Sequence, residues 1–248
     1  ATGNITFTRN SSVFNNSNRL LMVGGLVASG DENIAIGDTL TMSSMLSGGL
    51  KNVAIGMDSA TNITTGDANV CLGYRAGKAA TTGTSNVMIG TSAGNTSNDA
   101  VIEGSLNVFV GHEAGYPATG TISSNDCVYI GYTAGKGFTG GGSNTGIGSY
   151  ALAGGNAGEN NIAIGKLAGS GGITGSNNIC VGYDAGDTIK SGDKNIIIGF
   201  ESDVQEAAGC NRVAIGNSIR VNDDDTTVIA NTDIILDAAG DITLDIGS

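Results

Sequence analysis

Several chemical signatures are missing from this sequence. No run of apolar residues approaches the roughly 20 that a membrane-spanning helix needs. The four cysteines, Cys71, Cys127, Cys180 and Cys210, show no CxxC spacing, which argues against zinc or redox motifs and favours free thiols. G-x-S-x-G, P-loop and HExxH motifs are absent, and the only histidine, His112, is expected at the surface or in a loop. We therefore expect no enzymatic activity, no cofactor and no bound metal.

Positive charge and aromatic rings are also scarce. Lysine and arginine number 11 against 23 acidic residues, which gives a net charge of −12, and aromatic residues make up 4% of the chain. A chain this acidic repels phosphate backbones and anionic lipids. We therefore expect neither a nucleic-acid partner nor insertion into a membrane.

Glycine, in contrast, is abundant, at 42 of 248 residues. No G-X-Y period accompanies it, which excludes collagen, and the many valine and isoleucine residues argue against a disordered chain. A composition that is both glycine-rich and apolar indicates a chain that turns often between short buried strands.

The glycines belong to an internal repeat. The stretch "NIAIGKLAG" at 161–169 is followed by "NICVGYDAG" at 178–186 and "NIIIGFESD" at 195–203, each 17 residues after the last. Eleven units share the pattern G-x-x-N-h-x-h-G-x-x-A-G, where h is apolar, and three of them carry insertions. Short β-branched runs between turn residues predict strands, and units this small bury a face only by stacking. The sequence therefore predicts an all-β parallel β-solenoid of about eleven coils of about 17 residues.

Asparagine occupies the same corner in most units. The side-chain amides of successive coils can bond to one another as a ladder. Alternatively, asparagine is simply tolerated in the turn. Neither explanation makes asparagine a functional site.

The middle residue of each N-h-x-h-G strand leads to a prediction about assembly. Neighbours along a strand point to opposite faces, so we expect the two flanking apolar residues to fill the coil and the middle residue to point outward. The middle column is uncharged, and a soluble monomer rarely exposes such a stripe. We therefore predict a homo-oligomer, with a covering loop of the same chain as the alternative. The predicted interface residues are Ala54, Cys71, Met88, Phe109, Tyr129, Cys180, Ile197 and Ala214.

The repeats also resemble those of a known family. "NVAIGMDSA", "NVCLGYRAG" and "NIAIGKLAG" resemble the repeats of YadA-like heads in trimeric autotransporter adhesins, and more closely the N-T-A-I-G-x-x-A-G repeats of bacteriophage tail fibres. The resemblance covers about residues 30–220, although the 17-residue unit is longer than that of the adhesin heads. It implies an intertwined homotrimer with a left-handed parallel β-roll that serves in attachment.

The C-terminal segment "DIILDAAGDITLDIGS" carries an eight-residue repeat. It resembles the segment that precedes the self-cleaving chaperone domain of phage fibres and endosialidase-type tailspikes. In that family the chaperone is released by cleavage after a serine. The given sequence ends at Ser248, which would fit a cleaved product, but an arbitrary end of the given sequence explains this equally well. We therefore predict an N-terminal cap or shaft junction at 1–29, the solenoid at 30–220, and a C-terminal β segment at 221–248.

Two adjacent units with insertions contain the candidate binding residues. Loops on a rigid scaffold often carry recognition. Tyr116 can stack on a sugar ring, whereas His112, Glu113, Asn125 and Asp126 can hydrogen-bond to hydroxyl groups. The alternative is that these loops only tolerate extra length.

Two further acidic groups allow other chemistry. Glu103, Glu113 and Asp126 could pair between chains to hydrolyse a glycan, although loop carboxylates are usually just solvated. The acidic run at 222–227 could hold calcium, or it forms a charged turn at the end of the rod.

We expect a structural and receptor-binding segment of a phage tail fibre, located in the virion. Its partners would be a bacterial surface glycan or protein and other fibre or virion proteins. The alternatives are the head of a trimeric adhesin on a bacterial cell surface and a polysaccharide-depolymerising tailspike. Ice binding would require regular threonine rows, which the repeat columns lack.

Overall fold

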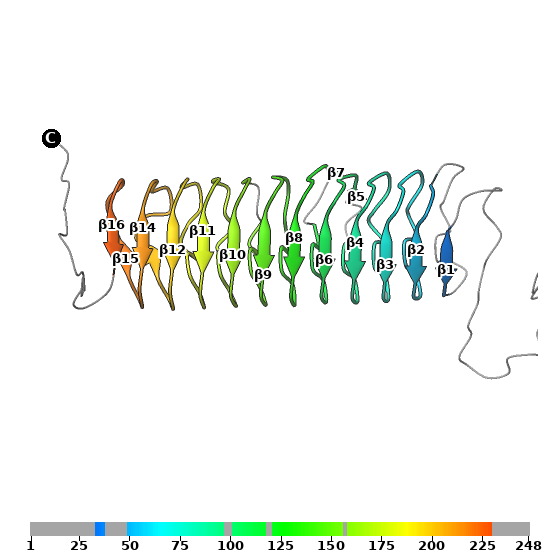
Figure 1. Cartoon of the computed structure of the whole chain (residues 1–248), viewed down its shortest axis with the longest axis horizontal. Helices are drawn as coiled ribbons and strands as arrows, with labels where there is room; N and C mark the ends of the chain where they lie inside the picture. The colour runs from blue at the N-terminus through cyan, green and yellow to red at the C-terminus, as the bar shows by residue number, and fades with distance from the viewer. Residues whose placement is uncertain (1–32, 38–48, 97–100, 118–120, 156–157, 230–248) are drawn as a thin grey trace, which may run out of the picture.

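The chain forms a straight rod of stacked coils. The computed structural model describes residues 33–37, 49–96, 101–117, 121–155 and 158–229. Twelve strands lie side by side in one sheet that runs the length of the rod (Figure 1). The predicted N-terminal cap at 1–29 lies outside the described residues, as does the C-terminal repeat after residue 229.

All strands are two or three residues long. The strands of the main sheet, in spatial order, are β1 (Ile34–Ile36), β2 (Val53–Ile55), β3 (Val70–Leu72), β4 (Val87–Ile89), β6 (Val108–Val110), β8 (Val128–Ile130), β9 (Thr145–Ile147), β10 (Ile162–Ile164), β11 (Ile179–Val181), β12 (Ile196–Ile198), β14 (Val213–Ile215) and β16 (Thr227–Ile229). Two small sheets pair β5 (Val101–Ile102) with β7 (Thr121–Ile122) and β13 (Asp203–Val204) with β15 (Arg220–Val221).

Every strand pair is parallel, and the register follows the repeat. Ile179 of β11 pairs with Ile196 of β12, which lies 17 residues later. Each coil therefore adds one strand to the main sheet, and the predicted parallel β-solenoid is confirmed. The solenoid continues past the predicted end at residue 220, because β16 pairs with β14.

Two left-handed corners limit the strands of the main sheet. In the coil of β11 these corners are Asn177, with φ of 62°, and Asp184, with φ of 55°, and the equivalent residues from β2 to β14 also have positive φ. Gly182, which follows the strand directly, has φ of 137°, a conformation that favours glycine. The chain therefore leaves the sheet after three residues in every coil.

The asparagine column forms a ladder, which confirms the first of the two explanations. The backbone N–H of Asn178 donates to Oδ1 of Asn161 at 2.9 Å, and Nδ2 of Asn178 donates to the same oxygen at 3.0 Å and to the carbonyl of Gly192 at 2.8 Å. These amides are fully buried, so each bond satisfies a group that would otherwise be costly to bury. At Cys127 only the backbone N–H continues the ladder, by donating to Asn107 Oδ1 at 3.0 Å.

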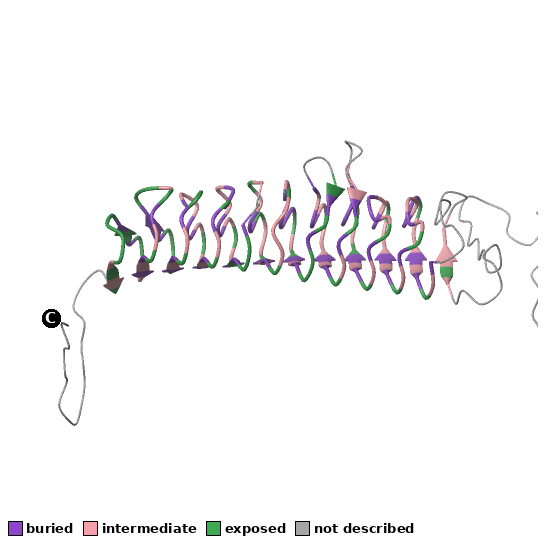
Figure 2. Cartoon of the chain, turned by 90° about the horizontal axis from the view of Figure 1, so that it is seen from above, coloured by how far each residue is buried: buried purple, intermediate pink, exposed green. Residues whose placement is uncertain are grey.

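The middle residue of each three-residue strand from β2 to β14 is buried and therefore lies inside the coil, whereas those of the outermost strands β1 and β16 are partly exposed (Figure 2). The strands show the pattern of a buried middle residue between two partly exposed neighbours, as in β3 and β11. The predicted subunit interface is therefore wrong, because all of its members are 0% exposed within a single chain. These residues are Ala54, Cys71, Met88, Phe109, Tyr129, Cys180, Ile197 and Ala214.

Limited space inside the coil explains this orientation. The glycine of the A-G pair lies across the coil from the middle residue, so that a Cβ at Gly115 would overlap the ring of Phe109. Where the middle residue is Gly146, the facing position is instead Leu152, which is buried. The interior therefore holds about one side chain between the strand and the facing turn.

A second row of side chains completes the core. Phe109 and Tyr129 stack with ring centroids 5.5 Å apart, and Phe138 packs against both rings at 5.8 and 5.6 Å. Phe138 belongs to the second row, and the other large side chains of that row are Ile63, Ile102, Ile122, Ile173 and Ile189. The core is thus a continuous apolar column along the rod.

Replacing Gly182 by alanine tests the close approach of neighbouring coils. A Cβ at Gly182 would overlap the carbonyl oxygen of Gly199, and φ of 137° is strained for alanine. We expect Gly182→Ala to lower the free energy of unfolding by roughly 3 kcal/mol or more in urea denaturation. The control is Gly140→Ala, whose Cβ would meet nothing within 4 Å. Equal unfolding midpoints for the two variants would contradict this explanation.

Candidate interaction surfaces

The outer face of the main sheet is apolar. Because the middle residue points inward, the first and third residues of each strand point outward, and we call this surface the sheet face. All of these residues are isoleucine, valine or leucine except Thr145 and Thr227. Ile89, Ile164 and Ile198 expose 36%, 40% and 37% of their surface. The sheet face is therefore a half-exposed apolar stripe.

The size of the sheet face exceeds what scattered surface residues produce. Twelve strands about 4.8 Å apart, each three residues long at about 3.3 Å per residue, cover roughly 58 by 10 Å, on the order of 600 Å². The face widens near its end, where Ile198, Phe200 and Ile215 line one shallow groove. This footprint lies at the upper end of the largest apolar patches on soluble monomers, about 300–600 Å², which are often functional.

A second polar ladder runs along the edge of the main sheet at which each strand begins. The side chain of Asn125 accepts the backbone N–H of Ser105 at 2.6 Å, and that of Asp193 accepts the N–H of Ser176 at 2.6 Å. Two of the predicted binding residues lie at this edge. Asn125 serves the ladder, whereas Asp126 is exposed at the left-handed corner, with φ of 59°.

The opposite edge of the main sheet, at which each strand ends, carries a cluster that we call the edge patch. Its members come from three successive coils and are His112, Glu113, Tyr116, Tyr132, Lys136 and Tyr150. His112 stacks on Tyr132 with centroids 5.3 Å apart, and Tyr132 meets the ring of Tyr150 edge-on at 5.4 Å. A hydrogen bond with Tyr150 raises the pKa of Tyr132. Half-exposed rings and hydroxyl groups thus lie together along this edge.

A charged pair completes the edge patch. Nζ of Lys136 contacts Oε2 of Glu113 at 2.6 Å and lies 5.4 Å from the ring centroid of Tyr116. The hydrogen bond to Glu113 raises the pKa of Lys136. The structure therefore brings His112, Glu113 and Tyr116 into one cluster.

The five predicted binding residues do not form one site. Asn125 and Asp126 precede β8, whereas His112, Glu113 and Tyr116 follow β6. Since β6 and β8 are parallel neighbours, the two groups lie at opposite edges of the sheet. Sequence reasoning also missed Tyr132, Lys136 and Tyr150, which a comparison of equivalent positions in neighbouring units would have placed beside His112.

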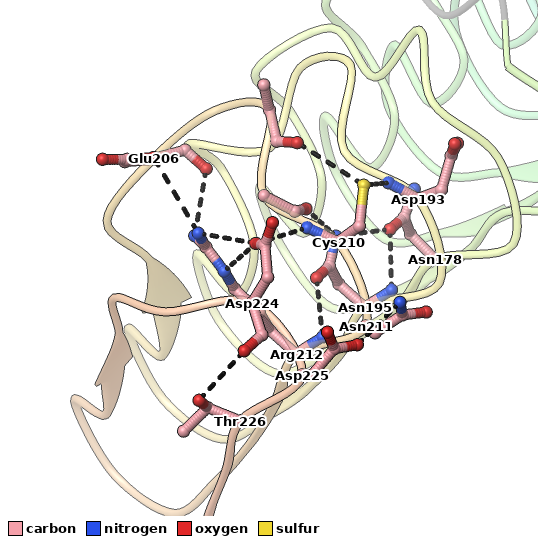
Figure 3. Close-up of polar contacts among 12 residues, drawn as sticks. Asn178, Asp193, Asn195, Glu206, Cys210, Asn211, Arg212, Asp224, Asp225 and Thr226 are labelled. Carbon is pink, nitrogen blue, oxygen red and sulfur yellow. Dashed lines mark hydrogen bonds and ion pairs between the residues drawn. The ribbon is translucent and has the colours of Figure 1, made fainter.

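The ladder ends at Arg212, which replaces asparagine in the last unit (Figure 3). Its backbone N–H donates to Oδ1 of Asn195 at 3.1 Å, and its guanidinium, 2% exposed, contacts Oδ1 of Asp224 at 2.8 Å. Asp225 accepts the side-chain amide of Asn211 at 2.9 Å. The acidic run at 222–227 is thus a charged turn between β15 and β16, with Asp224 and Asp225 engaged by neighbouring side chains.

The acid pairs predicted between chains stay a prediction, because the structure describes one chain. Within that chain Glu113 pairs with Lys136, and Asp126 lies at the opposite edge of the sheet. Within the described ranges, no group of three or more His, Cys, Asp or Glu side chains is placed to hold a metal ion. The same residues contain no helix that is long and apolar enough to cross a membrane.

Comparison with known proteins adds no relative. The chain matches no protein-family model, no curated protein and no solved structure. The functional interpretation therefore depends on the repeat and on the surfaces described above.

Thiol reactivity tests the inward orientation of the middle column. Burial raises the pKa of Cys71 and of Cys180 to about 12, and Cys127 is also buried with a raised pKa. Only Cys210 is partly exposed. We expect a thiol-disulfide reagent at pH 8 to label one thiol rapidly in the folded protein and four after denaturation.

The matched control is Cys210→Ser, which should remove the rapid phase and leave the slow thiols unchanged. Rapid labelling of Cys71 or Cys180 in the folded chain would show that the middle column points outward.

Proposed function

We propose that this chain is a non-enzymatic structural and receptor-binding segment of a bacteriophage tail fibre, and that it acts as a homotrimer. The observation that carries the proposal is a rigid repeat rod with one flat apolar face. An apolar face of this extent is stabilised when it is covered. The repeat resemblance supports three copies around one axis as the covering partner, and it also supports location in the virion.

The structure changes which residues would make the subunit contact. The first and third residues of each strand, rather than the middle ones, face outward. In the coil of β10 these are Ile162 and Ile164, at 37% and 40% exposed. The proposed trimer therefore buries the sheet faces of three chains against one another. A trimeric adhesin head from a bacterial surface would use the same assembly.

The edge patch is the proposed receptor-contact surface. Tyr132 and Tyr150 are 49% and 40% exposed, and the neighbouring Lys136, Glu113 and His112 offer hydrogen-bonding groups. Aromatic faces and edges with adjacent polar groups suit the apolar and hydroxyl surfaces of sugars. The ligand class is therefore a bacterial surface glycan, with a surface protein as the alternative.

Mass in solution tests the trimer. We expect the wild-type chain to have three times the 24.6 kDa mass of one chain in light scattering. Ile164→Lys places a charge in the sheet face and should dissociate the trimer, since an unpaired buried charge costs several kcal/mol. The matched control is Ser191→Lys, at an exposed position away from the sheet face, which should remain trimeric. A stable wild-type monomer would refute the proposed assembly.

Glycan binding tests the edge patch. Tyr132→Ala removes a half-exposed ring and should weaken binding on a glycan array by roughly 2- to 12-fold, which corresponds to about 0.5–1.5 kcal/mol for one aromatic contact. Tyr183→Ala is the control, because Tyr183 is also half-exposed, at 39%, at the same edge outside the patch. Unchanged binding by Tyr132→Ala, or equal loss in both variants, would remove the edge patch from consideration.

A further inference from the structure

Each coil has two positions that flank the sheet face. We call the residue three places before the middle residue the entry position and the residue three places after it the exit position. In the coil of β8, whose middle residue is Tyr129, these positions are Asp126 and Tyr132, and both residues are exposed. The strand lies between them, so the entry and exit positions of one coil lie at opposite edges of the sheet and do not meet within one chain.

Threefold symmetry brings entry and exit positions together. In the proposed trimer the three sheet faces surround one axis that is parallel to the rod, and each rotation about this axis carries the strand direction with it. The strands of one level therefore run head to tail around the axis, like the sides of a triangle. The end of a strand in one chain meets the beginning of the equivalent strand in the next chain at the same height.

The dimensions of packed sheets place these positions at the junction of two chains. Packed sheets lie about 10 Å apart, so each strand would lie about 5 Å from the axis, and a triangle of this size has sides of about 17 Å. This length corresponds to about five residues at about 3.3 Å each, or about two and a half on either side of the middle residue. The entry and exit positions therefore lie where two chains meet.

Exposed charges are complementary across such a junction. In the coil of β10, Lys166 occupies the exit position and Glu159 directly precedes the entry position, and in the coil of β12, Lys194 occupies the entry position and Glu201 directly follows the exit position. All four residues are exposed, and no ion pair of the described residues includes any of them. Asp193, which precedes Lys194, already accepts a backbone N–H in the second ladder. Charge complementarity thus favours contact between unlike edges of neighbouring chains.

We propose that the receptor site is completed between two chains, and this proposal rests on the homotrimer proposed above. His112 and Tyr132 in the edge patch of one chain adjoin Asn125 and Asp126 of the next chain. The five residues that the sequence singles out for binding lie at opposite edges of one chain, and the trimer joins them in one site at the subunit junction.

The junction combines an aromatic wall with hydrogen-bonding groups. The rings of His112 and Tyr132 stack at 5.3 Å and offer apolar surface to a sugar. The exposed carboxylate of Asp126 in the next chain accepts hydroxyl hydrogens. The side-chain oxygen of Asn125 already accepts the N–H of Ser105, so Asn125 offers its NH2 group. One chain thus supplies the stacking surface and the next chain supplies the polar groups.

The charge of the junction selects among sugars. Glu113 is paired with Lys136 in the edge patch, whereas no ion pair of the described residues includes Asp126. The junction therefore carries excess negative charge, which repels an acidic sugar. The ligand class is a neutral sugar of a bacterial surface glycan.

Cross-linking tests the junction without a ligand. Ser143 and Ser149 occupy the entry and exit positions of the β9 coil. In a chain that also carries Cys210→Ser, the double change Ser143→Cys and Ser149→Cys should allow a short bismaleimide to join three chains covalently, seen on a denaturing gel. Each single change is the control and should give no linked chains, because equivalent positions of different chains do not meet. A trimer in light scattering whose double variant stays unlinked would overturn the junction alone, whereas a monomer would refute the trimer as well.

Mixed trimers test the shared site. Tyr132→Ala should weaken binding to neutral glycans on an array by roughly 2- to 12-fold, and Asp126→Gly by roughly tenfold or more because it removes hydrogen bonds to a charged group. Glycine suits the φ of 59° at Asp126. When the two variants are unfolded and refolded together in equal amounts, about a quarter of the junctions combine an intact Tyr132 with an intact Asp126. Tight binding should therefore return in part.

The matched control for Asp126→Gly is Asn177→Gly. Asn177 is exposed at the entry position of the β11 coil, with φ of 62°, and its replacement should leave binding unchanged. Wild-type binding by Asp126→Gly, or no gain on refolding the two variants together, would overturn the shared site, while a loss in Tyr132→Ala would leave the edge patch in place. A wild-type trimer that binds no glycan on the array would overturn the receptor role and the shared site together.

Discussion

The narrow interior of each coil is the constraint on which the rest of the structure depends. Between the strand and the facing turn there is space for about one side chain, as the contact of Phe109 with Gly115 shows. Because neighbouring residues of a strand alternate between faces, a single inward side chain forces two apolar ones outward. The apolar sheet face is thus a consequence of the thin coil, and the compensation between Gly146 and Leu152 shows that the interior is nevertheless filled.

Two polar ladders make the stack straight enough for that face to act as one surface. Sheets of many strands normally twist, and flat ones are stabilised by stacking or by side-chain ladders. The asparagine amides bond from coil to coil inside the rod, and the side chains of Asn125, Asp193 and their equivalents bond along one edge. Similar bonds in most coils favour the same offset between neighbours, and the strands of the main sheet lie in one straight row (Figure 1).

The sequence allowed the repeat, the strand positions and the solenoid to be predicted, because every unit contributes the same columns. It did not reveal which side of the strand lies inside. Alternation along the strand places the middle residue and its neighbours on opposite faces, but it does not say which face is buried. The small A-G pair indicates the answer, because it leaves room inside the coil for the middle residue. The predicted binding residues fall into two groups for a related reason. Asn125 and His112 are close in the chain, but His112 follows β6 and Asn125 precedes β8, so they lie at opposite edges of the main sheet. Tyr132 and Lys136 were missed because proximity across coils follows the repeat interval, not the sequence distance.

Besides Cys127 and the Gly146–Leu152 exchange in the middle of the rod, several departures from the columns lie in the last described coils. Arg212 replaces the ladder asparagine and pairs with Asp224 from the shorter last described coil, where β14 and β16 are offset by 14 residues rather than 17. Asp203 puts a carboxyl group where six other units have glycine, and Phe200 contributes a half-exposed ring to the sheet face near it. A repeat protein gains stability from uniform neighbours, so each such exception lowers the uniformity of the stack. Arg212, Asp203 and Phe200 therefore distinguish the last described coils from the coils before them, where the columns of the sheet face are more uniform.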